Sequence, residues 1–314
     1  MRNKLVVAGA WGLFDHFLAL EKYPEDGETI CMDPRSVSAE KAFFGDCSGN
    51  IAVVAATLGV KTGFVTVAGN DFASSGYRQH LLDLGVDMSG VTILEQCPSG
   101  HNYNCFSPDG RGFCISQQGA AAYQSEEMIQ EAWFQDAAYT VICEAFSPYT
   151  LKALHCAKAQ GSKTVLSGMV GDRNPLWQDF LQAADILFIN RSEFGRLVQL
   201  AGSEQALFDR FSLERIFVTC GSEGSRTLDR NASLPVPIIR ADKVEDPTGA
   251  GDAFVAGTIA GLLQGLTPQQ AARIGAAASS FIIEQFGCQT NAPTWEQVCR
   301  RIEAQSEPTG GIAQ

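Results

Sequence analysis

The feature that most constrains the fold is a series of short apolar segments separated by stretches long enough to form helices. Four of these segments are residues 139–143, 164–166, 186–189 and 216–219. Each is a largely continuous apolar run, which is typical of parallel strands covered by helices on both faces. The pattern predicts a doubly wound α/β fold with a mainly parallel central sheet.

The N-terminal part of the chain continues this pattern. We expect a first strand at residues 5–8, a helix over residues 49–58 and a second strand at residues 64–67. With 314 residues, 45% of them apolar, the chain can bury a large core. We expect one domain over residues 1–314, with a flexible tail at residues 306–314.

The C-terminal third carries helix signals. The longest stretch without a charge, residues 253–272, is interrupted by polar residues and is therefore a poor membrane span, so we expect a buried helix. Capping boxes mark two further helix starts, at Thr267 with Gln270 and at Thr294 with Gln297.

Two segments break the alternation of strands and helices. Residues 30–44 are expected to be extended, and residues 101–117 to form a hairpin that turns at Ser107-Pro108-Asp109-Gly110. We expect the inserted segments, about 11–44 and 98–118, to form a small β lid. A lid over the carboxyl edge of a parallel sheet would exclude water from a ligand bound there.

The composition excludes several classes of protein. The chain has 23 Lys and Arg against 35 Asp and Glu, a net charge of −12, which disfavours binding to nucleic acid. Its ten cysteines include no C-x-x-C pair and its four histidines are not spaced as metal ligands, so we expect no zinc site. Free thiols and the absence of a signal-like segment predict a cytoplasmic protein without a membrane partner.

The strongest local signal is the segment from Asp246 to Phe254, a glycine loop that leads directly into an apolar helix. Gly249 and Gly251 allow backbone N–H groups to converge at the positive end of the helix dipole, where a phosphoryl group can bind. Asp252 would then take a proton from an attacking hydroxyl group. The simpler alternative is that Asp252 only caps the helix.

This segment resembles the C-terminal signature of the ribokinase-like (PfkB) family of carbohydrate and nucleoside kinases. Residues 45–52 resemble the N-terminal glycine motif of that family, and residues 190–193 its N-x-x-E motif. The order and spacing agree over nearly the whole chain. The resemblance implies a ribokinase-like Rossmann-type sandwich with a β lid, and a homodimer through the lid in some members.

The resemblance also implies roles for individual residues. Asp252 would be the general base, and the amides of Gly249, Ala250 and Gly251 would form an anion hole for the transferred phosphoryl group. Residues that would contact ATP and a water-bridged Mg²⁺ are Asn190, Glu193, Thr219, Gly221 and Gly224, the last three in a T-x-G-x-x-G loop. Without the resemblance, Glu193 would be an ordinary charge in a helix first turn and the loop glycines would only mark a turn.

The acceptor pocket is expected to contain Asp15, Gly45 and Asn50, which match substrate residues of the family. Carboxylate and amide groups suit the hydroxyl groups of a polyol, which an apolar pocket would leave unpaired. The alternative for Asp15 is an ordinary loop carboxylate. Asp246 and Thr248 match positions that bind a monovalent cation such as K⁺ in some members.

The chain departs from the family pattern at three places. Asp46 stands where the family has a second glycine, although a side chain is poorly suited to unusual backbone angles. Residues 166–169 replace a segment that is polar in many members. Residues 276–278 are three alanines where relatives often place Asn or His near the adenine.

The sequence therefore predicts an ATP-dependent kinase that phosphorylates a primary hydroxyl of a small sugar or sugar derivative. The alternative is a ribonucleoside kinase, since residues 48–52 and 287–290 resemble a nucleoside-phosphorylating branch. Aromatic residues near the lid could stack on a base or pack the lid; they are Trp11, Phe14, Phe43 and Tyr103. A non-catalytic ligand sensor is disfavoured by the intact Asp252 loop, and a dehydrogenase by the absence of G-x-G-x-x-G.

Overall fold

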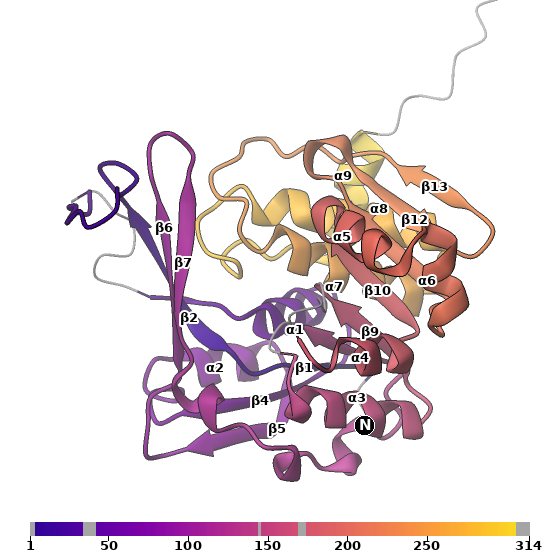
Figure 1. Ribbon diagram of the computed structural model, residues 1–314, viewed down its shortest axis with the longest axis horizontal. Coiled ribbons are helices and arrows are strands. Elements are labelled where there is room, and N and C mark those ends of the chain that lie inside the picture. The colour runs from indigo at the N-terminus through magenta and orange to yellow at the C-terminus, as the bar shows by residue number, and fades with distance from the viewer. Residues whose placement is uncertain (1–3, 34–41, 144–145, 169–173, 306–314) are drawn as a thin grey trace, which may run out of the picture.

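The computed structural model describes residues 4–33, 42–143, 146–168 and 174–305 (Figure 1). Within these residues one sheet has nine strands. In spatial order they are β13 (Ser233–Val236), β12 (Ser225–Leu228), β11 (Arg215–Thr219), β10 (Ile186–Asn190), β9 (Lys163–Ser167), β8 (Tyr139–Cys143), β1 (Leu5–Ala8), β4 (Thr62–Gly69) and β5 (Asp87–Leu94).

This sheet is mainly parallel, as the sequence predicted. The strands from β11 to β5 pair in parallel, with β1 between β4 and β8, whereas β12 and β13 are antiparallel at one edge. Every segment that was predicted to be a strand of this sheet lies in one of these strands.

Helices cover both faces of the sheet, so the strands are buried on both sides. Leu5 and Val7 of β1 belong to one core, and Val6 and Ala8 to the other. The first core is covered by α1 (Cys47–Thr57), α2 (Tyr77–Asp83), α7 (Ala250–Leu263), α8 (Pro268–Ile282) and α9 (Trp295–Ala304). The second is covered by α3 (Pro148–Ala159), α4 (Trp177–Ala183), α5 (Arg191–Ala201) and α6 (Glu204–Arg210).

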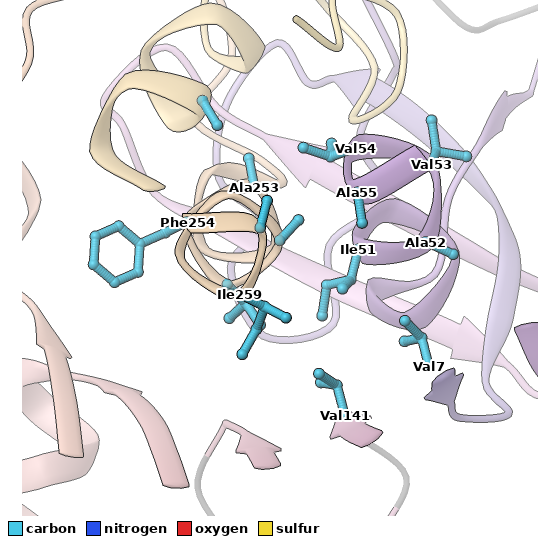
Figure 2. Close-up of a cluster of buried hydrophobic side chains, with 14 of the residues drawn as sticks. Val7, Ile51, Ala52, Val53, Val54, Ala55, Val141, Ala253, Phe254 and Ile259 are labelled. Carbon is cyan, nitrogen blue, oxygen red and sulfur yellow. The ribbon is translucent and has the colours of Figure 1, made fainter. Parts of the chain in front are cut away.

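The helices α1 and α7 lie side by side over the sheet. Figure 2 shows Ile51 on α1 and Ile259 on α7 above Val7 and Val141 of the sheet. All four side chains are fully buried. Because the two helices are packed together, their N-termini bring distant parts of the sequence to the same place.

The expectation of one buried helix over residues 253–272 is wrong, because the structure has two helices there. α7 ends at Leu263, and α8 begins at Pro268. Gly265 adopts a left-handed φ of 78°, and the predicted capping box at Thr267 starts the second helix. The second predicted box, at residues 294–297, starts α9.

A second sheet forms the predicted lid. Within the described residues its strands lie in the order β3 (Phe43–Phe44), β2 (Gly12–Ala19), β6 (Gly100–Phe106) and β7 (Gly112–Gln117). β6 and β7 form the predicted hairpin, which projects beyond the central sheet in Figure 1. Part of the segment predicted to be extended, residues 34–41, lies outside the described residues, as does the predicted tail at 306–314.

Short 3₁₀ helices lead from the lid back to the central sheet. They are η1 (Gly119–Tyr123), η2 (Glu126–Met128) and η3 (Glu131–Phe134), and a fourth, η4 (Gly221–Glu223), follows β11. Within the described residues, no helix is long and apolar enough to cross a membrane.

Candidate active site

The loop before α7 presents a helix N-terminus without a side-chain cap. Gly249 is the N-cap residue, with a left-handed φ of 79° and no side-chain hydrogen bond to the first turn. A Cβ at Gly249 would lie 2.8 Å from the Cβ of Cys288, so both the backbone and the available space require glycine. The Ala250 N–H donates to the Pro247 carbonyl at 3.3 Å.

Asp252 is not the cap of α7, so the simpler alternative for this residue is wrong. It is the third residue of the helix, and its side chain is buried. Asn50 Nδ2 from α1 donates to Asp252 Oδ2 at 2.8 Å, across 202 residues of sequence. The carboxylate therefore lies where the N-terminal ends of α1 and α7 meet.

Asp252 lines a cavity of about 160 Å³. Gly251 and Asp252 line it from α7, and Ser167 and Gly168 line it from the end of β9. The remaining lining residues come from α1, α7, β10, α5 and β11, and they are Cys47, Phe188, Ile189, Asn190, Glu193, Thr219, Phe254 and Val255. The structure thus brings five predicted site residues together around one cavity.

Asn190 and Glu193 form a capping box at the start of α5. Asn190 Oδ1 accepts from the Glu193 N–H at 2.9 Å, and Glu193 Oε2 accepts from the Asn190 N–H at 2.8 Å. Glu193 is therefore a first-turn residue, as the alternative proposed. It also lines the cavity, so both interpretations of this residue agree with the geometry.

The T-x-G-x-x-G loop follows β11 and needs its last glycine for steric reasons. Gly224 has a φ of 88°, and a Cβ there would lie 2.4 Å from the carbonyl oxygen of Val236. Gly221 also has a positive φ. Thr219 is the residue of this motif that lines the cavity.

An ion pair that the sequence did not indicate joins this loop to α5. Arg191 donates from both terminal nitrogens to the two carboxylate oxygens of Glu223, each at 2.7 Å. Arg191 lowers the pKa of Glu223 through this bidentate contact. Both side chains are exposed.

The residues predicted for the acceptor, Asp15, Gly45 and Asn50, form what we call the acceptor side, and Asn50 joins it to Asp252. Asp15 is in strand β2 and only 5% exposed, so it is not an ordinary loop carboxylate. A Cβ at Gly45 would lie 2.1 Å from Asp15 Oδ2, which explains the glycine. Asn102 Nδ2 donates to Asp15 Oδ1 at 3.0 Å, and Ser116 donates to Asn102 Oδ1 at 2.6 Å.

Sequence reasoning did not assign two residues of this side, Gln289 and Tyr77. Gln289 Nε2 donates to Asn50 Oδ1 at 3.0 Å and lies 2.7 Å from the Tyr77 hydroxyl group. Tyr77 donates to the Gly45 carbonyl at 3.0 Å. Gln289 lies in the segment 287–290, which resembles the nucleoside-phosphorylating branch, but neither that pattern nor any motif near Tyr77 indicates these contacts.

The acceptor side is strongly acidic. Asp15, Asp46, Asp246 and Asp252 are all buried, with exposed fractions of 8% or less. Burial raises the pKa of the Cys288 thiol well above its usual value, and the neighbouring carboxylates of Asp15, Asp252 and Asp246 raise it further. A negatively charged acceptor would be repelled here.

Asp46 adopts the unusual backbone angles that the sequence suggested for its position. Its φ is 69° and its ψ is 130°. The carboxylate accepts from the Ser48 N–H at 2.6 Å, from the Ser48 hydroxyl group, and from the Trp11 N–H at 3.1 Å. It thus caps α1 and binds the segment that leads into the lid.

Asp246 and Thr248, the predicted cation residues, contact each other. Asp246 Oδ1 accepts from the Thr248 N–H at 3.0 Å and from its hydroxyl group at 2.6 Å. In the described part of the chain, the other oxygen, Oδ2, is buried without a hydrogen-bond partner. A buried carboxylate oxygen without a donor is suited to a cation.

Phe14 and Tyr103 of the lid lie away from Asp15, whereas Phe43 of β3 pairs directly with Asp15 and shares its face of the lid sheet. Phe14 stacks on His101, and Tyr103 stacks on His16, on the face of the lid sheet opposite to Asp15. Phe14 and His101 line a separate cavity of about 430 Å³, together with Ala42, Phe44, Asp71, Ser74 and Ser75. Phe43 packs edge-on against Phe17.

The three departures from the family pattern lie in different surroundings. Ala277 and Ala278 are fully buried in α8, and Ala276 is partly buried. Ser167 and Gly168 line the cavity beside Asp252, whereas Met169 lies outside the described residues. Asp46 is the departure that changes hydrogen bonding at the site.

The fold and the site together define a phosphotransferase that acts on an alcohol group. Residues 40–295 match the pfkB family of carbohydrate kinases, and the chain belongs to this family. A nucleoside kinase of Methanocaldococcus jannaschii is 30% identical over 96% of this chain and 97% of its own length. A ribokinase of Staphylococcus aureus is 25% identical over 95% of this chain and 99% of its own length.

The similarity extends to solved structures. The crystal structure of the Methanocaldococcus jannaschii nucleoside kinase, an archaeal member of the ribokinase family, superposes with a TM-score of 0.84. It is 26% identical, and the match covers 97% of this chain and 100% of that one. The predicted ribokinase-like fold is confirmed, and the chain is an ATP-dependent kinase of the sugar and nucleoside class.

Proposed function

We propose that this kinase transfers the γ-phosphoryl group of ATP to a primary hydroxyl group of an uncharged sugar, with Asp252 as the general base. The observation that carries the proposal is the position of Asp252. Asp252 lines the cavity together with Asn190 and Glu193, and its carboxylate accepts from Asn50 of the acceptor side. A base at such a boundary can reach a hydroxyl group on one side and a phosphoryl group on the other.

The proposed reaction is a direct displacement. Asp252 takes the proton of the acceptor hydroxyl group while the oxygen of that hydroxyl group bonds to the γ-phosphorus. The bond from the γ-phosphorus to the β–γ bridging oxygen breaks, which releases ADP. Amides of the first turn of α7, from Gly249 to Gly251, stabilise the charge on the phosphoryl oxygens. The uncapped N-terminus at Gly249 supports this role.

Asn190, Thr219, Gly221 and Gly224 are proposed to contact ATP, and Glu193 to hold Mg²⁺ through water. Within the described residues no group of three or more His, Cys, Asp or Glu side chains could hold a metal ion. An ion held by few protein ligands, water and substrate phosphates is typical of Mg²⁺. When bound, Mg²⁺ would neutralise phosphate charge.

A monovalent cation such as K⁺ is proposed at Asp246 and Thr248. The support is the buried Asp246 Oδ2, which has no donor among the described residues. A cation at this oxygen would lie beside the loop that begins α7, because Thr248 directly precedes Gly249. Its test is the dependence of turnover on K⁺ at constant ionic strength.

The acceptor side supports a neutral polyol. Asp15 and Asn102 present carboxylate and amide groups, and the buried carboxylates disfavour phosphorylated sugars. A ribonucleoside is the second candidate, favoured by the 30% identity to a nucleoside kinase over nearly the whole chain. Phe14 and Tyr103 lie on the opposite face of the lid sheet, whereas Phe43 shares the face of Asp15 and offers an aromatic ring there.

The remaining proposals concern organisation. We propose one domain over residues 1–314, with the segments 11–44 and 98–118 inserted as the lid, and a cytoplasmic location without nucleic-acid or membrane partners. A homodimer through the lid is supported by Ile115, which is 58% exposed and pairs with Tyr103 on the face opposite to Asp15. Sedimentation of the wild type and of Ile115→Asp tests this dimer.

The experiment that tests the function is ADP release from ATP and Mg²⁺ with separate panels of sugars and ribonucleosides. We expect turnover with neutral pentoses or hexoses and none with their phosphates. Turnover with ribonucleosides alone would select the second candidate. Turnover with phosphorylated sugars alone would contradict the role given to the buried carboxylates.

A further inference from the structure

Gln289 was not predicted to belong to the site, but it lies at the start of a chain of hydrogen bonds that ends at Asp252. Its side chain is 8% exposed and lies between α8 and α9. Gln289 Nε2 donates to Asn50 Oδ1 at 3.0 Å, and Asn50 Nδ2 donates to Asp252 Oδ2 at 2.8 Å. The two amides therefore connect in series to the carboxylate.

Asp252 and the Gly45 carbonyl, at the two ends of this chain of hydrogen bonds, determine how the side-chain amides of Asn50 and Gln289 are oriented. Asp252 is expected to be ionised as a general base, so only the nitrogen of Asn50 can donate to it. The Gly45 carbonyl can only accept, and it lies 3.3 Å from Gln289 Nε2. Gln289 must then turn its nitrogen toward Asn50, whose oxygen accepts from it.

This direction matters because the Asn50 amide has a donor end and an acceptor end. If Asn50 rotated by half a turn, its oxygen would face the Asp252 carboxylate, and two acceptors would repel each other. Gln289 prevents that rotation, because it leaves no acceptor for the Asn50 nitrogen on its own side. A hydrogen bond from Asn50 also favours the charged form of the carboxylate.

We propose that Gln289 is a positioning residue for phosphoryl transfer. Its amide holds Asn50 in the orientation that donates to Asp252, and Asn50 in turn orients the general base toward the acceptor hydroxyl group. This inference rests on the proposed role of Asp252. Gln289 acts through Asn50 and does not itself contact the reacting atoms.

A purely structural role for Gln289 would operate through different contacts. Gln289 also lies 2.7 Å from the Tyr77 hydroxyl group, and Tyr77 donates to the Gly45 carbonyl. These contacts join the loop before α9 to α2 and to the start of α1. The variant Tyr77→Phe removes the hydroxyl contacts and leaves the hydrogen bonds from Gln289 through Asn50 to Asp252.

The kinetic test compares Gln289→Met with Tyr77→Phe. Methionine has a similar length but no donor, so we expect kcat to fall about tenfold, with the KM for ATP changed less than about twofold. Tyr77→Phe should lower the melting temperature about as much as Gln289→Met does, while its kcat falls much less. Gln285→Met, at an exposed glutamine four residues earlier, serves as the control.

A double-mutant cycle tests the route through Asn50. In an Asn50→Ala background, Gln289→Met should change kcat less than about twofold, because the hydrogen bonds that connect Gln289 to Asp252 through Asn50 are already absent. A full tenfold loss in that background would overturn the proposal. So would a Tyr77→Phe variant that reproduces the kcat loss of Gln289→Met.

A spectroscopic measurement covers the case in which no acceptor supports turnover. The side-chain amide protons of Asn50 can be assigned by comparison of wild type with Asn50→Asp in ¹⁵N-labelled protein. We expect one proton shifted downfield by the Asp252 contact, and loss of that shift in Gln289→Met. An unchanged resonance would refute the positioning role.

The outcomes also separate this inference from the proposed function. If Asp252→Asn retained turnover, the proposed general base would be wrong, whatever Gln289→Met does. If Asp252→Asn were inactive and Gln289→Met behaved like wild type in kcat and in the Asn50 resonance, only the positioning role would fail.

Discussion

Two helix N-termini meet at this site, and they are built differently. α7 starts after Gly249, at a φ of 79°, without a side-chain cap. α1 starts after Asp46, at a φ of 69°, and its first turn is capped by the Asp46 carboxylate. That carboxylate also binds the Trp11 N–H at the entrance to the lid.

The difference shows how two helix N-termini of similar geometry can be suited to different substrates. A helix N-terminus with an uncapped first turn can receive an external anion, whereas one that holds its own carboxylate repels it. The α7 end is therefore suited to the phosphoryl group of ATP, and the α1 end to a neutral acceptor. Asp252 and Asn50 lie between them.

The largest expected effect is that of Asp252→Asn, which removes the proposed general base between the two helix N-termini. We expect kcat to fall about a thousandfold or more, because asparagine keeps the shape but cannot take the proton. ATP binding, measured by calorimetry, should change less than about threefold. Near wild-type turnover would show that the base lies elsewhere.

The second largest effect is expected for Gly249→Ala, which alters the uncapped N-terminus of α7. The left-handed φ and the 2.8 Å approach to the Cys288 Cβ predict a loss of about 2–3 kcal/mol in unfolding free energy, measured by urea denaturation. Displaced amides should lower kcat about ten- to a hundredfold.

Gly251→Ala is the matched control for this prediction. A Cβ at Gly251 would meet no atom within 4 Å, and its φ is not positive. We expect its unfolding free energy to stay within about 1 kcal/mol of wild type. Equal destabilisation by both variants would contradict the steric argument at Gly249.

Much of this comparison could be predicted from the sequence, because it depends on local patterns. The apolar runs predict the parallel sheet, and the glycine spacing predicts the loop before α7. The substitution of glycine by Asp46 predicts a conflict with the backbone, which the φ of 69° confirms. These signals are short-range, so the neighbouring residues are sufficient to reveal them.

The compensating contacts could not be predicted in this way. Trp11 lies 35 residues from Asp46, and Gln289 lies 239 residues from Asn50. Such pairs meet only after the sheets and helices have packed, and polar residues of these types occur in many solvated loops.

The contribution of Asp46 to the capped N-terminus of α1 is tested by the variants Asp46→Gly and Asp46→Ala together. Both variants remove the carboxylate that caps α1, but only alanine keeps a Cβ at a positive φ. We therefore expect alanine to be less stable than glycine by about 1–2 kcal/mol in unfolding free energy. Equal stabilities would mean that the backbone at residue 46 carries no strain that depends on a side chain.

The smallest expected effect is that of Glu223→Gln, which breaks the ion pair with Arg191 on the ATP side. Both partners are exposed, so water and salt already screen the attraction. We expect the KM for ATP to rise less than about twofold at low salt, with the difference from wild type disappearing near 1 M salt. The Asp46 contacts are buried, so the difference in stability between Asp46→Ala and wild type should persist at the same salt concentration. A salt-insensitive defect in Glu223→Gln would mean that Arg191 acts on the nucleotide through a protected contact, and the ATP side would then depend on buried charge as the acceptor side does.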